Sequence, residues 1–121
     1  MELQPGRRAR VSLTVDESDT AISLGSGDVP VLGTPAVLAL AERAAVAAVS
    51  DELDAEQTTV GSWAQLHHMA PSRVGAEVQA EAELTAVTGP RLEFRITVTE
   101  GETEVARVEH RRVVVDRARF S

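Results

Sequence analysis

One long and almost entirely apolar helix limits the folds that this chain can adopt. The segment from Thr34 to Leu53, TPAVLALAERAAVAAVSDEL, is rich in alanine and leucine, which favour helix formation. Thr34 is a good N-cap residue, and Pro35 suits the first position of a helix. Because apolar residues surround nearly the whole helix, we expect it to be buried on several sides.

The segments around this helix alternate between apolar and polar residues, as half-buried β-strands do. Before the helix, Val11, Leu13 and Val15 share one face of a predicted strand, and residues 23–33 predict a loop or flap rich in Gly, Ser and Pro. After the helix, alternation predicts strands in residues 59–70, 76–85, 91–100 and 103–116. The tetrapeptides TGPR and EGET supply turns between the last three strands.

The order of these elements predicts an α+β fold. An antiparallel sheet with one apolar face, curled around a single buried helix, buries both the helix and the strands. This is the hotdog fold, and we expect one hotdog domain over residues 1–121. The alternative is another small α+β fold, such as a cone-shaped sheet with helices, but such folds usually open with helices and this chain opens with a strand.

Composition excludes several classes of function. The net charge of −7 argues against a nucleic-acid binder, and all 12 basic residues are arginine, which excludes lysine chemistry. Cysteine is absent, which excludes thiolate nucleophiles and thiolate metal sites. We find no signal peptide and no segment that would span a membrane, and we expect a cytoplasmic protein.

Two of the three histidines are adjacent, in the segment GSWAQLHHMAPSRVG. On a strand they point to opposite faces, so they cannot bind one metal ion together, and we predict no metal site. We expect His68 on the apolar face and His67 on the other face. The predicted neighbours of His68 on its face are Val60, Ala64, Leu66 and Ala70, and those of His67 are Trp63 and Gln65. His68 is then either a satisfied core histidine or a residue that takes part in chemistry.

Glu42 is the second polar residue in an apolar setting. At helical spacing it shares a face with Leu38, Ala41, Ala45 and Val46. A carboxylate in such surroundings is a useful base or nucleophile. The alternative is that Glu42 and Arg43 mark the exposed side of the helix. Thr34 has two interpretations as well, a simple N-cap or a hydroxyl beside an oxyanion-binding helix N-terminus.

Taken together, these residues resemble the hotdog thioesterases, specifically the fluoroacetyl-CoA thioesterase family. The resemblance covers residues 31–120 and rests on three segments, GTPAVLALAERAA, VGSWAQLHHMAPSRVG and HRRVVVDRARF. Members carry a threonine before the helix, a glutamate about two turns later and a histidine in an H-[LM]-A-P-x-x-V-G segment. Thr34, Glu42 and His68 match these catalytic positions. Gly61 and Arg112 match positions that we expect at the substrate.

The resemblance implies a homodimer whose sheets join and whose acyl-CoA sites lie at the interface. It implies hydrolysis of a small acyl thioester with no cofactor, since coenzyme A belongs to the substrate. Glu42 would attack the carbonyl or activate water, His68 would transfer protons, and Thr34 would orient Glu42 or the water. The family's namesake closes its acyl pocket with phenylalanines before the helix. Residues 23–33 contain no aromatic side chain, so the resemblance does not determine which acyl group the substrate carries.

Two rival functions belong to other classes. One is a non-catalytic module that binds acyl-CoA or another small ligand on the same scaffold. The other is a hotdog hydratase or dehydratase, which needs a different acid–base pair that we do not find.

Overall fold

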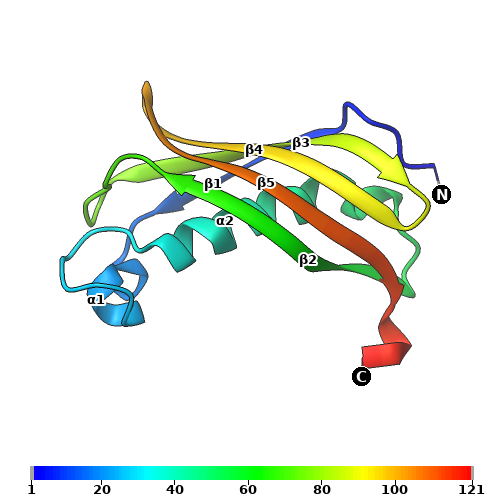
Figure 1. Cartoon of the computed structure of the whole chain (residues 1–121), viewed down its shortest axis with the longest axis horizontal. Coiled ribbons are helices and arrows are strands. Elements are labelled where there is room, and N and C mark those ends of the chain that lie inside the picture. The colour runs from blue at the N-terminus through cyan, green and yellow to red at the C-terminus, as the bar shows by residue number, and fades with distance from the viewer. Residues whose placement is uncertain (1, 121) are drawn as a thin grey trace.

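The computed structural model describes residues 2–120, in which one sheet packs over one long helix (Figure 1). The strands are β1 (Arg8–Thr14), β2 (Gln57–His68), β3 (Glu77–Thr88), β4 (Arg91–Glu100) and β5 (Thr103–Asp116). The helices are α1 (Ala21–Leu24) and α2 (Thr34–Val49), with short 3₁₀ turns at Glu17–Asp19, Ser50–Glu52 and Arg117–Phe120. The predicted α+β hotdog architecture is confirmed. Among these residues no helix is long and apolar enough to cross a membrane.

Helix α2 begins one residue earlier than predicted, and this changes the role of Thr34. The N-cap is Gly33, which has no side chain to cap the helix, and Thr34 is already helical. The predicted N-cap role of Thr34 is therefore wrong. Because its hydroxyl is not used at the helix end, it can contact another element.

The buried face of α2 consists mostly of small side chains, which lets the sheet approach the helix closely. The helix residues buried in the core are Val37, Leu40, Ala41, Ala44, Ala45, Ala48 and Val49. The opposite side is exposed along Ala39, Arg43, Val46 and Ala47. The helix is thus buried on one broad face and open on a narrow strip.

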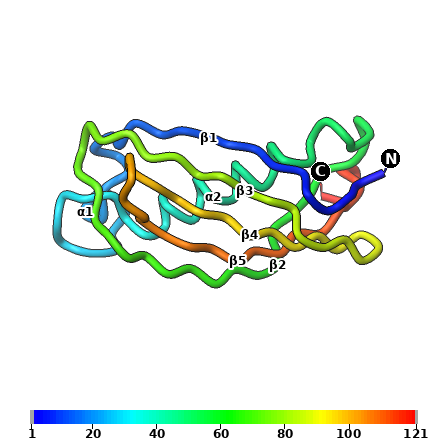
Figure 2. Tube along the Cα trace, turned by 90° about the horizontal axis from the view of Figure 1, so that it is seen from above, coloured from blue at the N-terminus to red at the C-terminus, as the bar shows by residue number. Residues whose placement is uncertain are grey.

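All neighbouring strands of the sheet are antiparallel, in the order β1-β3-β4-β5-β2 (Figure 2). The strand that follows α2 does not pair with the next strand in sequence. It lies at the far edge beside the last strand, β5, and so brings the predicted histidine strand next to the strand that carries His110 and Arg112.

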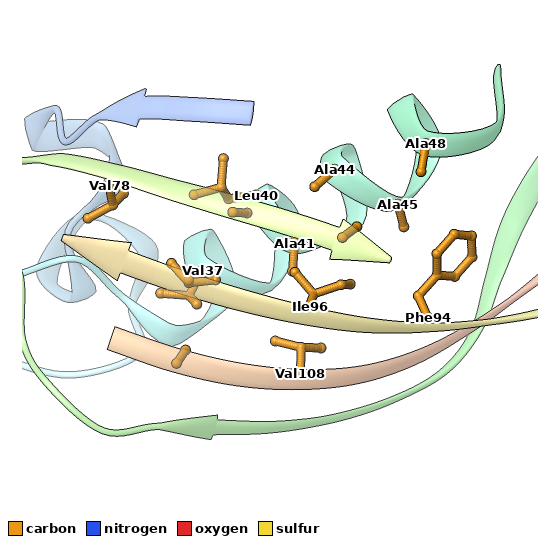
Figure 3. Close-up of a cluster of buried hydrophobic side chains, with 14 of the residues drawn as sticks. Val37, Leu40, Ala41, Ala44, Ala45, Ala48, Val78, Phe94, Ile96 and Val108 are labelled. Carbon is orange, nitrogen blue, oxygen red and sulfur yellow. The ribbon is translucent and has the colours of Figure 1, made fainter. Parts of the chain in front are cut away.

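The predicted alternation of the central strands is confirmed. The inward residues are Val78, Ala80, Ala82 and Leu84 on β3, and Leu92, Phe94, Ile96 and Val98 on β4. They pack against α2 in one core (Figure 3). The turns at Gly89 and Gly101 have φ of 59° and 58°, a left-handed conformation that glycine adopts without strain.

Strand β2 contains an irregularity that the alternation did not predict. The pairing with β5 shifts between Gly61 and Trp63, so that Ser62 is an extra residue in the ladder. Beyond the shift, the even-numbered residues Ala64, Leu66 and His68 pair with inward residues of β5. Before the shift, the odd-numbered residues Thr59 and Gly61 face inward instead. The prediction that Val60 shares the face of His68 is wrong, because the bulge turns Val60 towards solvent.

Candidate active site

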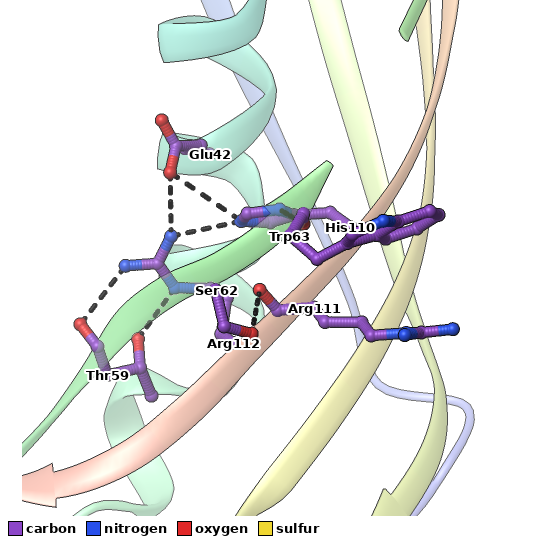
Figure 4. A network of polar contacts seen from close by, with 7 residues as sticks. All are labelled: Glu42, Thr59, Ser62, Trp63, His110, Arg111 and Arg112. Carbon is purple, nitrogen blue, oxygen red and sulfur yellow. Dashed lines mark hydrogen bonds and ion pairs between the residues drawn. The ribbon is translucent and has the colours of Figure 1, made fainter. Parts of the chain in front are cut away.

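A polar cluster lies where α2 faces the bulge of β2 and the middle of β5 (Figure 4). Its centre is Glu42, on the third turn of α2, whose side chain is 38% exposed. One carboxylate oxygen, Oε2, accepts a hydrogen bond from Arg112 Nη1 at 3.2 Å and lies 3.7 Å from His110 Nε2. The carboxylate is therefore held on one side and open on the other.

Arg112 is buried, with only 7% of its surface exposed, and its guanidinium makes hydrogen bonds in several directions. Nε donates to the Thr59 hydroxyl at 2.8 Å, and Nη2 donates to the Thr59 carbonyl at 3.0 Å. Burial lowers the pKa of Arg112, while the charge of Glu42 and its hydrogen bond raise it. An arginine stays protonated in such a site, so Arg112 presents a fixed positive charge to Glu42.

His110 completes the cluster and is almost fully buried. Its Nδ1 lies 2.8 Å from the Trp63 carbonyl oxygen, and its Nε2 lies 3.1 Å from Arg112 Nη1. Burial is the largest influence on this histidine and lowers its pKa. Arg112 also lowers the pKa, against the Trp63 carbonyl and Glu42, which raise it. His110 is therefore neutral at neutral pH, and its approach to Glu42 is not an ion pair.

Gly61 leaves room for the Glu42 carboxylate. A Cβ atom at this position would lie 2.7 Å from Glu42 Oε2 and 3.2 Å from His110 Cε1. A larger residue at this position would therefore force the end of the Glu42 side chain to move. Gly61 thus lets the carboxylate approach the strand, directly before the bulged Ser62.

A second polar contact lies at the N-terminal end of α2. Thr34 Oγ1 is 2.9 Å from Nδ1 of His68, the last residue of β2. The other ring nitrogen, His68 Nε2, is buried and has no hydrogen-bond partner within residues 2–120. Thr34 thus contacts the imidazole through one nitrogen, and the second nitrogen is enclosed without a partner in the described residues.

The structure brings the five predicted site residues together as two groups. Gly61 and Arg112 lie against Glu42, and Thr34 lies against His68. Eight residues of helix separate Thr34 from Glu42, which corresponds to about 12 Å along the axis. The hydroxyl of Thr34 therefore contacts His68 in this chain, and no hydrogen bond in the described part of the chain joins it to Glu42.

His67 faces away from both groups, as strand alternation predicts. It is exposed and pairs with Arg107 on the outer face of the sheet. Trp63 lies on the same outer face, where the Arg111 guanidinium stacks 4.5 Å from the centre of its ring. Within residues 2–120, no three His, Asp or Glu side chains are grouped as metal ligands.

Two members of the Glu42 cluster, Thr59 and His110, were not assigned a role from the sequence. His110 carried a weak signal, because it shares the face of Arg112 at a spacing of two residues. Thr59 carried none, since its contact with Arg112 depends on the pairing of β2 with β5 and on the bulge.

A shallow groove of about 580 Å³ opens beside the Glu42 carboxylate along the exposed strip of α2. Its lining includes Ala39, Glu42, Arg43, Val46, Ala47 and Arg112. The groove combines small apolar side chains with an anchored carboxylate and two arginines, a combination suited to a small polar ester or thioester.

Comparisons with known proteins identify the family. Residues 15–118 match the family described as fluoroacetyl-CoA-specific thioesterase. The fluoroacetyl-CoA thioesterase of Streptantibioticus cattleyicolor is 30% identical over 91 residues, which is 75% of this chain and 66% of that relative.

Solved structures extend the similarity to nearly the whole chain. A Phe-to-Ala variant of the fluoroacetyl-CoA-specific thioesterase, in complex with fluoroacetate and CoA, superposes with a TM-score of 0.91 at 26% identity, covering 98% of this chain and 100% of that chain. A hot-dog-like protein from Thermanaerovibrio acidaminovorans gives a TM-score of 0.84 at 24% identity over 97% of this chain and 93% of that chain, which supports the fold. On the extent of the family match, this chain belongs to the fluoroacetyl-CoA-specific thioesterase family.

Proposed function

We propose that this protein hydrolyses the thioester of a small acyl-CoA. The observation that carries the proposal is the Glu42 carboxylate, anchored by Arg112 on one oxygen and open to a groove on the other side. Family membership favours this function over the non-catalytic binding module.

In the proposed reaction, water supplies the oxygen that joins the acyl carbon, and the C–S bond breaks to release coenzyme A as the thiol. Glu42 serves either as the nucleophile that attacks the carbonyl or as the base that takes a proton from water. Both routes need an ionised carboxylate, and Arg112 Nη1 donates a hydrogen bond to Glu42 Oε2.

His68 is the proposed proton donor and acceptor. Its Nε2 is the nitrogen that we propose for this role, because Nδ1 contacts the Thr34 hydroxyl and Nε2 has no partner in the described residues. An imidazole can both accept and donate a proton, which suits the delivery of a proton to the leaving sulfur. The substrate contacts of Gly61 and Arg112, which we expect from the sequence, stay predictions, and in the structure both residues lie against Glu42.

We also propose that the active form is a homodimer. Strand β2 is an edge strand, and edge strands with free backbone groups favour pairing with another strand. The exposed Val60 and Trp63 lie on this strand, on its outward face. Pairing of two β2 strands would also bring the site residues of two chains close together. The cytoplasmic location that we expect stays a prediction.

A panel of acyl-CoA esters of increasing length, assayed for release of free thiol, tests the proposed function. We expect turnover of short acyl-CoAs without specificity for fluoroacetyl-CoA, because residues 23–33 lack aromatic side chains. Calorimetric binding of the same esters without thiol release would contradict hydrolysis and would support the binding module.

A further inference from the structure

His110 is the most buried ionisable side chain next to Glu42, and the proposed reaction does not use it directly. Only 2% of its side chain is exposed, so it does not reach the groove. Both ring nitrogens nevertheless have polar partners, the Trp63 carbonyl and the Arg112 guanidinium. A buried imidazole with two defined partners constrains the groups around it.

The partners of His110 fix its tautomer. The Trp63 carbonyl can only accept a hydrogen bond, so Nδ1 must carry the proton at a distance of 2.8 Å. The Arg112 guanidinium can only donate, so Nε2 must present its lone pair at 3.1 Å. His110 is therefore a neutral imidazole that donates to the bulged strand β2 and accepts from β5.

In this arrangement each of the two protons on Arg112 Nη1 has its own acceptor. One N–H is directed to His110 Nε2 at 3.1 Å, and the other is directed to Glu42 Oε2 at 3.2 Å. The Thr59 hydroxyl and carbonyl hold the rest of the guanidinium. Without the acceptor on His110, Nη1 would lose its only contact besides Glu42 in the described residues, and the two bonds to Thr59 alone would hold the guanidinium.

We propose that His110 is a positioning residue, whose unprotonated Nε2 orients Arg112 so that Arg112 holds the Glu42 carboxylate in its reactive geometry. The role rests on the proposed function, since it concerns the same carboxylate. His110 touches no substrate in this arrangement and acts through Arg112. Its second bond, to the Trp63 carbonyl, ties this geometry to the β2 bulge.

Three substitutions separate the two bonds of His110. In His110→Gln, the side-chain oxygen takes the place of Nε2 and can accept from Arg112, while the bond to Trp63 is lost. In His110→Asn, the amide takes the place of Nδ1 and can donate to Trp63, while Arg112 loses its acceptor. His110→Leu removes both bonds, and His67→Asn on the outer face is the matched control.

We expect His110→Gln to retain most of the wild-type kcat. We expect His110→Asn and His110→Leu to reduce kcat about 10- to 100-fold with little change in KM. Thermal unfolding of each variant shows whether it is folded. Wild-type kcat in folded His110→Asn, or a loss in His110→Gln as large as in His110→Asn, would overturn the proposal.

Nitrogen NMR of the imidazole rings tests the positioning geometry without any turnover. We expect the His110 ring to carry its proton on Nδ1 at neutral pH, and a proton on Nε2 instead would overturn the proposal. If the ring has the expected tautomer but no acyl-CoA is hydrolysed, the proposed function fails while the orientation of Arg112 by His110 stands.

Discussion

The two polar groups beside α2 differ in how completely their hydrogen bonds are satisfied. In the Glu42 group, Arg112 makes four hydrogen bonds, to Thr59, His110 and Glu42, and is buried. In the Thr34 group, one contact holds His68, and the second imidazole nitrogen has no partner within residues 2–120. Arg112 is therefore fixed by several contacts, whereas His68 is fixed by one contact and its Nε2 has no partner in the described residues.

This difference separates two requirements of a hydrolytic site. A carboxylate that must stay ionised and oriented needs a fixed opposite charge, which Arg112 supplies from the sheet. In the proposed reaction His68 exchanges protons, which requires one nitrogen to be anchored and the other to have no partner within the protein, and the contact with Thr34 agrees with this requirement. We expect substitutions in the two groups to affect the rate by different physical routes.

The largest expected effect is that of Glu42→Gln. The amide keeps the size of the side chain but provides neither a base nor a nucleophile, so we expect kcat for short acyl-CoAs to fall by about 10³-fold or more. Thiol release under single-turnover conditions measures this loss. Glu102→Gln, in the exposed turn between β4 and β5, is the matched control and should keep the wild-type rate.

His68→Ala should reduce kcat by about 10²- to 10⁴-fold, because it removes the proposed proton donor. His67→Ala, one residue earlier and on the outer face, should leave the rate close to wild type. The same thiol-release assay compares the two variants. If His67→Ala were the impaired variant, the assignment of faces beyond the bulge would be wrong.

Gly61→Ala tests the packing around the carboxylate without removing any polar group. Because the new Cβ would lie 2.7 Å from Glu42 Oε2, the carboxylate must move, and we expect a loss of about 10- to 100-fold in kcat. Ser62→Ala, at the adjacent bulged position, is the control. A wild-type rate in Gly61→Ala would show that the position of Glu42 is less restricted than its contacts indicate.

The smallest expected effect is the contribution of His110 to the loss of thermal stability at low pH. Burial lowers the pKa of His110 below its ordinary value of 6.5, so the unfolded chain binds a proton more readily than the folded chain. The stability due to neutral His110 is present above about pH 6.5 and is lost as the pH falls below it. Thermal unfolding at pH 7.5 and 5.5 should show a larger decrease for wild type than for His110→Gln. An equal decrease in both would mean that His110 is not held neutral.

The sequence predicted the elements of the fold because their hydrophobic patterns are strong. The apolar composition of α2 predicted a long buried helix, although α2 ends at Val49 and leaves one strip exposed. The alternation of β3 and β4 predicted which of their faces is buried. Alternation also placed His68 inward and His67 outward, since both lie beyond the bulge.

The parts that the sequence did not predict depend on long-range pairing. The predicted face of Val60 is wrong, because a segment of small and polar residues gives no clear sign of the bulge at Ser62. Thr59 and His110 joined the Glu42 group only because β2 crosses to the far edge and pairs with β5. The predicted N-cap, Thr34, is wrong by one residue, because the helix is capped at Gly33. The Thr34 hydroxyl does not cap the helix and contacts His68 instead.

The central claim is that the two groups serve one reaction, and a double-mutant cycle of Glu42→Gln and His68→Ala tests it most directly. Single-turnover thiol release is measured for wild type, both single variants and the double variant, with the same short acyl-CoA. We predict strong non-additivity, in which the double variant is about as slow as the slower single variant, because residues that act as a unit are lost together. If the double variant were slower by the product of the two single losses, the groups would act independently and the claim would be contradicted.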